Sequence, residues 1–315
     1  MTSTAVTPPR NFQFRSIADR ENILGGIFLA PAVLYILLLV AIPFFVAIAF
    51  SVTDVSVGDT TLDFVGFRNF IVILRDPQFI RALKDTILFT IVSQVLILVF
   101  ANIVAAVFTQ EFRGKWLARM LIMLPWATPI SLGVIGWLWM LDSKFSPFDW
   151  ILVNLNLLGP GTLLGPGNHM NFLGREGLAM ASVIMVYVWR NLPLASVILM
   201  AGLTSIDKDL IDQAQVDGAR FWRIHFRIKI PLVLPIMYIA LLFSMVFTFT
   251  DMAVVFILTR GGPVYYTQVL GVWAFFKGIQ GGALGEGAAV ALFFFPVLLA
   301  VAILLLRLAR RTEVN

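Results

Sequence analysis

The sequence contains no cysteine and only two histidines, His169 and His225. The missing cysteines exclude disulfides, thiolate zinc sites and a cysteine nucleophile. The two histidines are far apart in sequence and have no carboxylate cluster beside them, which disfavours a histidine metal centre. We expect both histidines at the protein surface. A membrane-embedded enzyme is also disfavoured, because no carboxylate pair repeats at helical spacing within an apolar segment.

Charged residues are scarce as well. They make up 13% of the chain, against 59% hydrophobic residues, and the mean hydropathy is +0.91. A soluble domain carries roughly a quarter of its residues as charges. This chain of 315 residues could not cover so much apolar surface in water. Lipid must therefore be the solvent for most of it.

Apolar segments long enough to cross about 30 Å of hydrocarbon recur along the chain. They predict an all-α, polytopic membrane protein with about six transmembrane helices. The six segments are 24–52, 86–108, 117–141, 178–202, 232–258 and 285–306. The first is too long for the apolar part of a signal peptide, and we interpret it as a retained anchor.

Basic residues predict the orientation of these spans. One set of alternate loops and both tails carry 14 Lys and Arg, and the opposite loops carry 8. The positive-inside rule then places both termini in the cytoplasm. These residues set topology, so we expect no nucleic-acid partner. The predicted parts are a cytoplasmic tail over 1–23, a transmembrane domain over 24–307 and a second cytoplasmic tail over 308–315.

The largest inward loop, residues 204–231, is the most informative stretch. Thr204 or Ser205 is expected to cap a short helix that runs to about Val216. Asp217-Gly218 then predicts a break, because glycine adopts backbone angles that other residues avoid. In an isolated sequence an ordinary turn between surface helices is the default interpretation of this pair.

A second, amphipathic helix is predicted from residue 219 to residue 230, where it meets a proline at the membrane. Arginines repeat at the same helical spacing as the apolar residues, one position earlier. The apolar positions are Phe221, Ile224 and Ile228, and the basic positions are Arg220, Arg223 and Arg227.

This loop resembles the cytoplasmic signature of ABC importer permeases, which reads Glu-Ala-Ala-x-x-Asp-Gly-Ala and is followed by a run ending in Ile-x-Leu-Pro. Asp212 stands at the Glu position and Gln213 and Ala214 at the two Ala positions, while His225 stands where the family usually has Phe. The outright matches are Asp217, Gly218, Ala219, Trp222, Ile228 and Pro231. Four further segments resemble the maltose- and glycerol-phosphate-like, sugar-importing branch of this binding-protein-dependent family: 64–70, 124–126, 201–203 and 258–263.

The resemblance implies a type I ABC importer permease fold and half of a translocation pathway for a carbohydrate in a prokaryotic plasma membrane. It implies that residues 204–231, hereafter the coupling loop, dock on a separate ATPase dimer. The implied coupling residues are Asp212, Ala214, Asp217, Gly218 and Ala219. A second, different permease subunit, an extracytoplasmic solute-binding protein and membrane lipid are the other implied partners.

No cofactor is expected on the chain itself, because it has no phosphate-binding loop and the only Gly-Lys pair, Gly114-Lys115, is followed by Trp116. ATP would be bound and hydrolysed by the partner subunit. The chain is thus expected to be a non-catalytic transport subunit.

Arg190 and Asp251 are the conspicuous charges inside predicted spans. Such groups are costly in lipid and usually face a cavity or a partner. One hypothesis places them, with Asn191, along the solute path. The other makes them a structural ion pair or water-exposed groups near a helix end. Their predicted depths differ, so the sequence does not require them to touch.

Two other functions remain open. A phosphorylated polyol or another non-sugar polar solute would suit an ABC permease with a further basic cluster in its cavity. An ion-coupled secondary transporter would also have kinked spans, but it would show internal repeats and several charges near the midplane. Such a transporter has no use for a coupling loop.

Overall fold

The computed structural model describes residues 21–59 and 61–313, with side chains for residues 25–59 and 61–311. Most of the predicted tail 1–23 therefore lies outside the described residues. At the other end a helix continues to Glu313, so the predicted tail 308–315 begins as helix. Within the described residues the chain is helical and forms no strand.

The described residues form two compact units, which divide between Ala49 and Phe50. The first contains α1 (Glu21–Ile36), a π-helical turn η2 (Leu37–Ala41) and most of α2 (Ile42–Ser51). Together they make a helix over Gly25–Ser51, long and apolar enough to cross a membrane. This agrees with the first predicted span.

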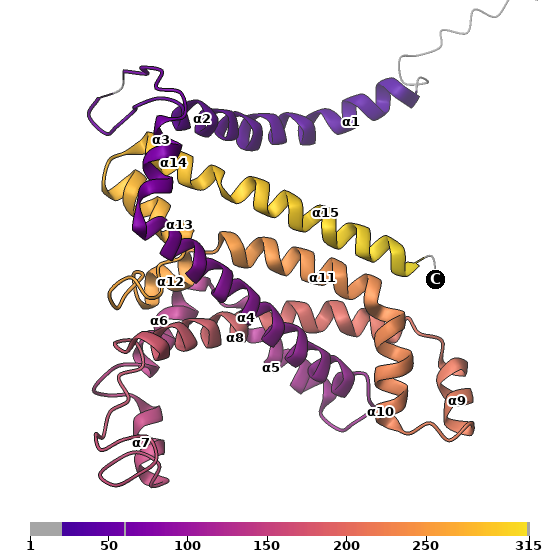
Figure 1. Ribbon diagram of the computed structural model, residues 1–315. Coiled ribbons are helices and arrows are strands. Elements are labelled where there is room, and N and C mark those ends of the chain that lie inside the picture. The colour runs from indigo at the N-terminus through magenta and orange to yellow at the C-terminus, as the bar shows by residue number, and fades with distance from the viewer. Residues whose placement is uncertain (1–20, 60, 314–315) are drawn as a thin grey trace, which may run out of the picture. The chain divides into compact units, whose positions relative to one another are not determined.

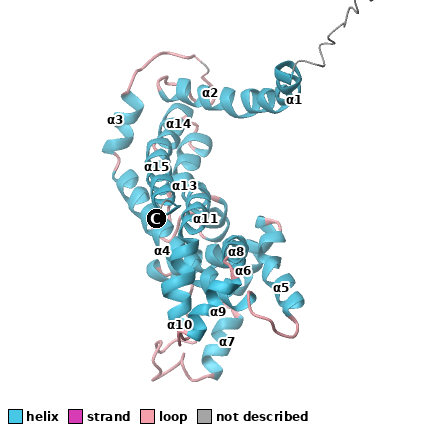
Figure 2. Cartoon of the chain, turned by 90° about the vertical axis from the view of Figure 1, so that its right-hand side faces the viewer, coloured by secondary structure: helices cyan, strands magenta, loops and turns pink. Residues whose placement is uncertain are grey.

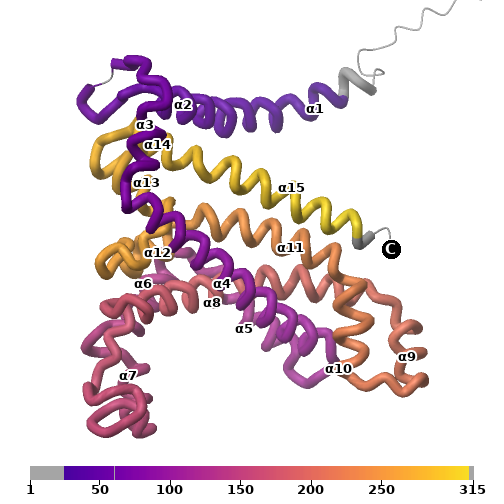
Figure 3. The backbone as a smooth tube through the Cα atoms, viewed as in Figure 1, coloured from indigo at the N-terminus to yellow at the C-terminus, as the bar shows by residue number. Residues whose placement is uncertain are grey.

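The second unit carries the remaining helices, whose course can be followed in Figures 1 and 3. They are α3 (Arg68–Arg75), α4 (Pro77–Phe108), α5 (Lys115–Ala127), α6 (Ile130–Met140), α7 (Pro147–Asn154), α8 (Glu176–Thr204), α9 (Lys208–Val216), α10 (Phe221–Ile224), η3 (His225–Lys229), α11 (Ile230–Thr250), α12 (Ala253–Leu258), α13 (Leu270–Phe275), η4 (Phe276–Gln280), α14 (Leu284–Leu292) and α15 (Phe294–Glu313).

Helix α8 is the centre of this unit. It packs against α4, α5 and α11, and α11 packs in turn on α15 (Figure 1). Small residues allow the close approach: a Cβ at Gly202 would lie 3.1 Å from the Ile236 side chain of α11. Larger apolar side chains fill the space between the axes, and Phe89 of α4 meets the Tyr187 ring edge-on with the centroids 5.0 Å apart.

Five helices are long and apolar enough to span a membrane, and a bent pair can make the sixth. The predicted third span is this pair, α5 and α6, which meet at an angle of 97°. Thr128 between them is extended because it precedes Pro129, which disfavours helical angles in the residue before it. The predicted segment 117–141 is therefore a bent pair of helices.

The predicted fifth span, 232–258, is also interrupted. Helix α11 ends at Thr250, Asp251 is extended, and the short α12 follows. The Asp251 side chain accepts a hydrogen bond from the backbone N–H of Val254 at 3.2 Å and so helps to begin α12. Helix α12 packs against α6, so the segments that follow the two helix breaks lie together.

The coupling loop and the helices α7 and α12 to α14 lie at opposite ends of this unit (Figure 1). Figure 2 looks onto the end that carries α9 and α10. At the other end Lys277 bonds to Asp76 at 3.2 Å and to Glu286 at 3.0 Å. Burial alone would lower the pKa of Lys277, but its hydrogen bonds to Glu286 and Asp76 outweigh burial and raise that pKa. The ammonium thus stays charged and ties the start of α4 to η4 and α14.

Close backbone packing explains two glycines of the segment 278–287. A Cβ on Gly287 of α14 would overlap the Cα of Gly278 in η4 and lie 2.9 Å from its nitrogen. Backbone atoms cannot move aside as a flexible side chain can. These two glycines therefore allow η4 and α14 to pack closely at this contact.

We expect Gly287→Ala to lower the free energy of unfolding by about 1–3 kcal/mol, because it overpacks the contact with Gly278. The loss would appear as a lower thermal unfolding midpoint of the purified protein in detergent. Gly136→Ala in α6 is the matched control, since a Cβ there meets nothing within 4 Å. Equal midpoints for the two variants would contradict this interpretation.

Candidate functional site

The short helix of the coupling loop is α9, and its N-terminus is capped by Asp207. The Asp207 carboxylate accepts a hydrogen bond from the backbone N–H of Asp209 at 3.0 Å. Thr204 and Ser205, the expected caps, instead donate their hydroxyls to carbonyls of α8, at Ala201 and Gly202 respectively. They finish the preceding helix, because their side chains reach back one turn.

Helix α9 ends at Val216, as predicted, in a turn that needs glycine. Gly218 has φ +80°, and its N–H bonds to the Gln215 carbonyl at 2.9 Å. The N–H of Ala219 bonds to the Ala214 carbonyl, also at 2.9 Å. This pair of bonds is the Schellman arrangement that closes a helix on a left-handed residue. Nothing lies within 4 Å of a Cβ built on Gly218, so backbone angle and not space selects glycine there.

The five predicted coupling residues share this one helix and turn. Asp212, Asp217 and Gly218 are exposed, whereas Ala214 and Ala219 are half-buried and joined by the backbone bond. Asp209, Asp212 and Asp217 line a shallow pocket with Gln213 and Val216, and Val216 is 88% exposed. The outer face of α9 therefore offers carboxylates around an apolar side chain, and it is open to a partner.

The second helix of the coupling loop was wrongly expected to stop at residue 230. It begins at Phe221 and continues through Pro231 as one span to Thr250. A π turn, η3, marks the junction, where the Ile230 N–H bonds to the His225 carbonyl five residues earlier. Pro231 offers no N–H to the carbonyl four residues before it, so a regular α pattern cannot continue unbroken here.

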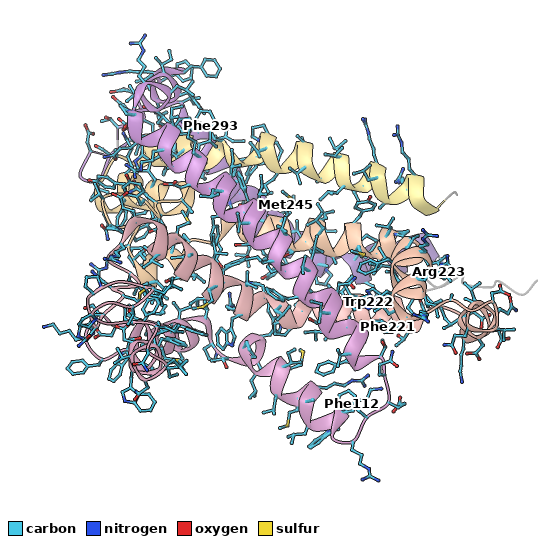
Figure 4. All side chains as sticks on the ribbon, turned by 60° about the horizontal axis from the view of Figure 1, so that its bottom comes forward. Phe112, Phe221, Trp222, Arg223, Met245 and Phe293 are labelled. Carbon is cyan, nitrogen blue, oxygen red and sulfur yellow. The ribbon has the colours of Figure 1, made fainter. Side chains whose placement is uncertain are left out.

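The start of this helix is rich in aromatic side chains. Phe221, Trp222 and Arg223 lie at the end of the unit beside α9 (Figure 4). Trp222 stacks on Phe226 with the ring centroids 5.7 Å apart, and both are exposed. His225 departs from our expectation of a surface histidine: it is only 5% exposed. Its imidazole contacts Asn102 of α4, a contact that requires the tertiary fold.

Arg190 and Asp251 are brought together. The Nη1 atom of Arg190 lies 3.9 Å from Oδ2 of Asp251, and their side chains are 21% and 12% exposed. The guanidinium also lies 5.9 Å from the ring of Trp126, near the end of α5. Arg190, in the middle of α8, thus sits beside both helix breaks. Asn191 is buried and donates to the Tyr187 carbonyl of its own helix at 2.9 Å.

Several buried polar side chains of α4 and α11 were not among the predicted site residues. On α4, Thr90, Ser93 and Gln94 are buried, and Gln94 donates to the hydroxyl of Thr248 on α11. Within the described part of the chain, the hydroxyls of Thr90 and Ser93 and the carbonyl oxygen of Gln94 have no partner. Polar residues at i, i+3 and i+4 in an apolar helix were a signal that could have found them.

The side chains of this arrangement can bind polar groups. Alcohol and amide groups are buried on α4 and α11, the helix that ends at the ion pair's Asp251, and such groups suit hydrogen bonding to an uncharged solute. Among the described residues no group of three His, Cys, Asp or Glu could hold a metal ion.

Comparison with known proteins identifies the architecture. Residues 97–314 match the family described as the inner membrane component of binding-protein-dependent transport systems. The chain belongs to this family. It is therefore a permease subunit of an ABC importer, a non-catalytic transport component of the inner membrane, and an ion-coupled secondary transporter is not favoured.

Relatives agree over nearly the whole chain. A probable ABC transporter permease of Sinorhizobium fredii is 30% identical, covering 91% of both chains. The trehalose/maltose permease MalF of Thermococcus litoralis is 26% identical, covering 92% of this chain and 95% of that protein. The crystal structure of a bacterial importer of the acidic polysaccharide alginate has the same fold, with a TM-score of 0.78, 19% identity and 93% and 96% of the two chains covered.

We expect Arg190→Met and Asp251→Asn each to destabilise the protein by about 3 kcal/mol, because each leaves the other charge buried and unpaired. The double variant removes both charges and should recover most of the loss. Thermal unfolding midpoints in detergent of the unchanged protein, the two single variants and the double variant give the interaction free energy between Arg190 and Asp251. Strictly additive losses would mean that the two side chains do not act as a pair.

Proposed function

We propose that this permease forms half of a translocation pathway for a carbohydrate and couples it to a separate ATPase dimer through the coupling loop. The observation that carries the coupling is the construction of α9. It is a short helix closed at both ends, by Asp207 and by the turn at Gly218, with an exposed outer face. Because groups of this chain cap both helix ends, α9 does not need a partner to complete its hydrogen bonds, and its outer face is rigid enough to contact one.

The partners follow from this role. The chain has no phosphate-binding loop, so ATP is bound by the partner ATPase and no cofactor by this subunit. A second permease of different sequence completes the pathway, and an extracytoplasmic solute-binding protein delivers the cargo. Family members are components of binding-protein-dependent systems, and one similar structure holds alginate pentasaccharide-bound periplasmic protein. Both termini and the coupling loop lie in the cytoplasm, as the distribution of Lys and Arg predicts.

The nature of the cargo is supported by relatives and by charge. Similar permeases are named for trehalose/maltose, sulfoquinovosyl glycerol and diacetylchitobiose. In this chain Arg190 is paired with Asp251, so the cation is balanced before any solute arrives. The buried polar side chains of α4, and Thr248 of α11, carry hydroxyls and amides. Neutral sugar hydroxyls suit such groups better than a phosphate does.

A phosphorylated polyol is the alternative cargo. The sn-glycerol-3-phosphate permease UgpA of Yersinia pestis is 26% identical, covering 84% of this chain. A dianionic phosphate calls for cations that are not already paired. Arg190 does not meet that condition, and for this reason we favour the neutral sugar.

We expect Gly218→Pro to abolish co-purification of the ATPase with this tagged chain from its native membrane. Proline cannot adopt φ +80° and lacks the N–H that bonds to Gln215. Gly218→Asn is the matched control, because asparagine tolerates left-handed angles. It should retain the ATPase and the second permease. If the wild-type chain purifies alone, the importer assembly proposed here is wrong.

We expect the double variant Arg190→Met, Asp251→Asn to slow uptake about tenfold. Loss of one hydrogen bond between the solute and a charged group corresponds to a factor of about that size. Initial rates of uptake of radiolabelled trehalose and of glycerol 3-phosphate by cells that make the complex are the measurement. Ser196→Ala, which removes a buried hydroxyl bonded only to its own helix at Leu192, should leave the rate unchanged. Unaltered uptake in the double variant would contradict a solute-path role, and wild-type uptake of glycerol 3-phosphate alone would favour the alternative cargo.

A further inference from the structure

His225 joins the coupling loop to the second span. Its Nε2 atom lies 2.6 Å from Oδ1 of Asn102 on α4. Since an amide oxygen only accepts, the imidazole N–H is the donor. Apart from the local bond of the Ser205 hydroxyl to Gly202 at the end of α8, the side-chain hydrogen bonds and ion pairs of the described residues include no other link from residues 205–231 to a different helix. The contact is thus the polar link between this loop and the bundle.

The imidazole is held firmly in place. It stacks on Phe221 one turn earlier, with the ring planes 5° apart, and meets Phe226 edge-on. His225 also begins the π turn, and its carbonyl accepts the N–H of Ile230. Side chain and backbone of one residue therefore connect α10, α11 and α4. Such π turns inside α-helices are frequent at functional sites.

The link lies directly beneath the coupling helix. A cavity of about 240 Å³ is bounded by His225 and Ile224 on one side and by Ile211 and Gln215 of α9 on the other. Gln110, just after α4, and Lys229 also line it. This space separates α9 from the bundle. If α9 moves toward the bundle, the space can shrink and leave the bundle where it was. A rigid contact beside the space is therefore needed to pass the movement of α9 on to the bundle.

We propose that the Asn102–His225 hydrogen bond is the positioning contact that makes α4 follow the coupling helix when the ATPase closes. The inference rests on the coupling function proposed above and adds the residue pair through which motion enters the bundle. A phenylalanine, the usual residue at this position in permeases that the loop resembles, would stack on Phe221 equally well but could not hold Asn102. The polar link is accordingly a property of this chain.

The absence of cysteine allows a direct test in the co-purified complex. Spin labels at Lys208→Cys, at the start of α9 and outside the pocket of its outer face, and at Ile103→Cys on α4, both exposed positions, report the separation of the two helices by double electron–electron resonance. The complex is measured without nucleotide and after trapping with ATP and vanadate. In the otherwise unchanged chain we expect one narrow distance distribution that is the same in both states, since α9 and α4 move together.

With His225→Phe, the distribution should shift or broaden on trapping, while the ATPase still co-purifies and basal ATP hydrolysis stays within about twofold of the parent. A mutation at a coupling contact of this kind changes the coupling between two sites about two- to thirtyfold. His225→Gln, whose amide can still donate to Asn102, should restore the narrow distribution. The double variant Asn102→Leu, His225→Phe removes both polar groups, so no unpaired amide is left if His225→Phe alone is unstable. Its distance distribution should change on trapping as that of His225→Phe does.

A distance that stays narrow and constant on trapping in both His225→Phe and the double variant overturns the proposal. So does a nucleotide-dependent shift already present in the parent. Ser196→Ala serves as the control for loss of a buried hydrogen bond elsewhere and should leave the distribution unchanged. Failure of the parent chain to retain any ATPase is a separate result: it would refute the proposed importer assembly itself.

Discussion

Close packing around α8 is the constraint on which the rest of the second unit depends. Water cannot satisfy backbone groups inside hydrocarbon, so the spans must be helices, and lipid supplies no hydrophobic force to bring them together. Association then relies on shape. Gly202 lets α11 approach, and the buried Phe89 and Tyr187 rings fill the space toward α4. Residues carried by these three helices consequently have defined neighbours.

The two helix breaks owe their positions to this centre. The α5–α6 bend follows from Pro129, and the end of α11 from the extended Asp251. Freed backbone groups at such breaks need partners in a membrane. The Asp251 carboxylate supplies one to Val254 and also faces Arg190 of α8. One cation in the middle of the continuous helix α8 therefore stands beside the ends of two interrupted spans, and interrupted helices are where transporters commonly bind their solutes.

The coupling loop contains an exposed helix, α9, whose position and ends are fixed although it has no buried residues. None of the residues of α9 is buried, so packing contributes little to its stability. Its ends are set by the Asp207 cap and by the left-handed Gly218. Behind it, the π turn at His225–Lys229 and the contact with Asn102 connect the loop to α11 and α4. Local capping shapes the outer surface, and long-range contacts hold it on the bundle.

Much of this was determined by the amino-acid sequence alone. Long apolar segments had to become helices, because lipid offers the backbone no other partner. Asp217-Gly218 had to end α9, because only a residue free to adopt positive φ closes that turn. The family signature consists of residues whose roles are local, such as this turn, and it could therefore be recognised from the sequence without the fold.

Tertiary structure alone decided the pairings. Arg190 and Asp251 are 61 positions apart in the chain, as their numbering shows, and His225 is separated from Asn102 by 123. Nothing in local propensity specifies which faces of two helices meet. Sequence reasoning placed His225 at the surface and left Arg190 and Asp251 at different depths for this reason. The crossing of α4, α8 and α11 settled those contacts, since side chains far apart in the chain meet only when helix packing brings their faces together.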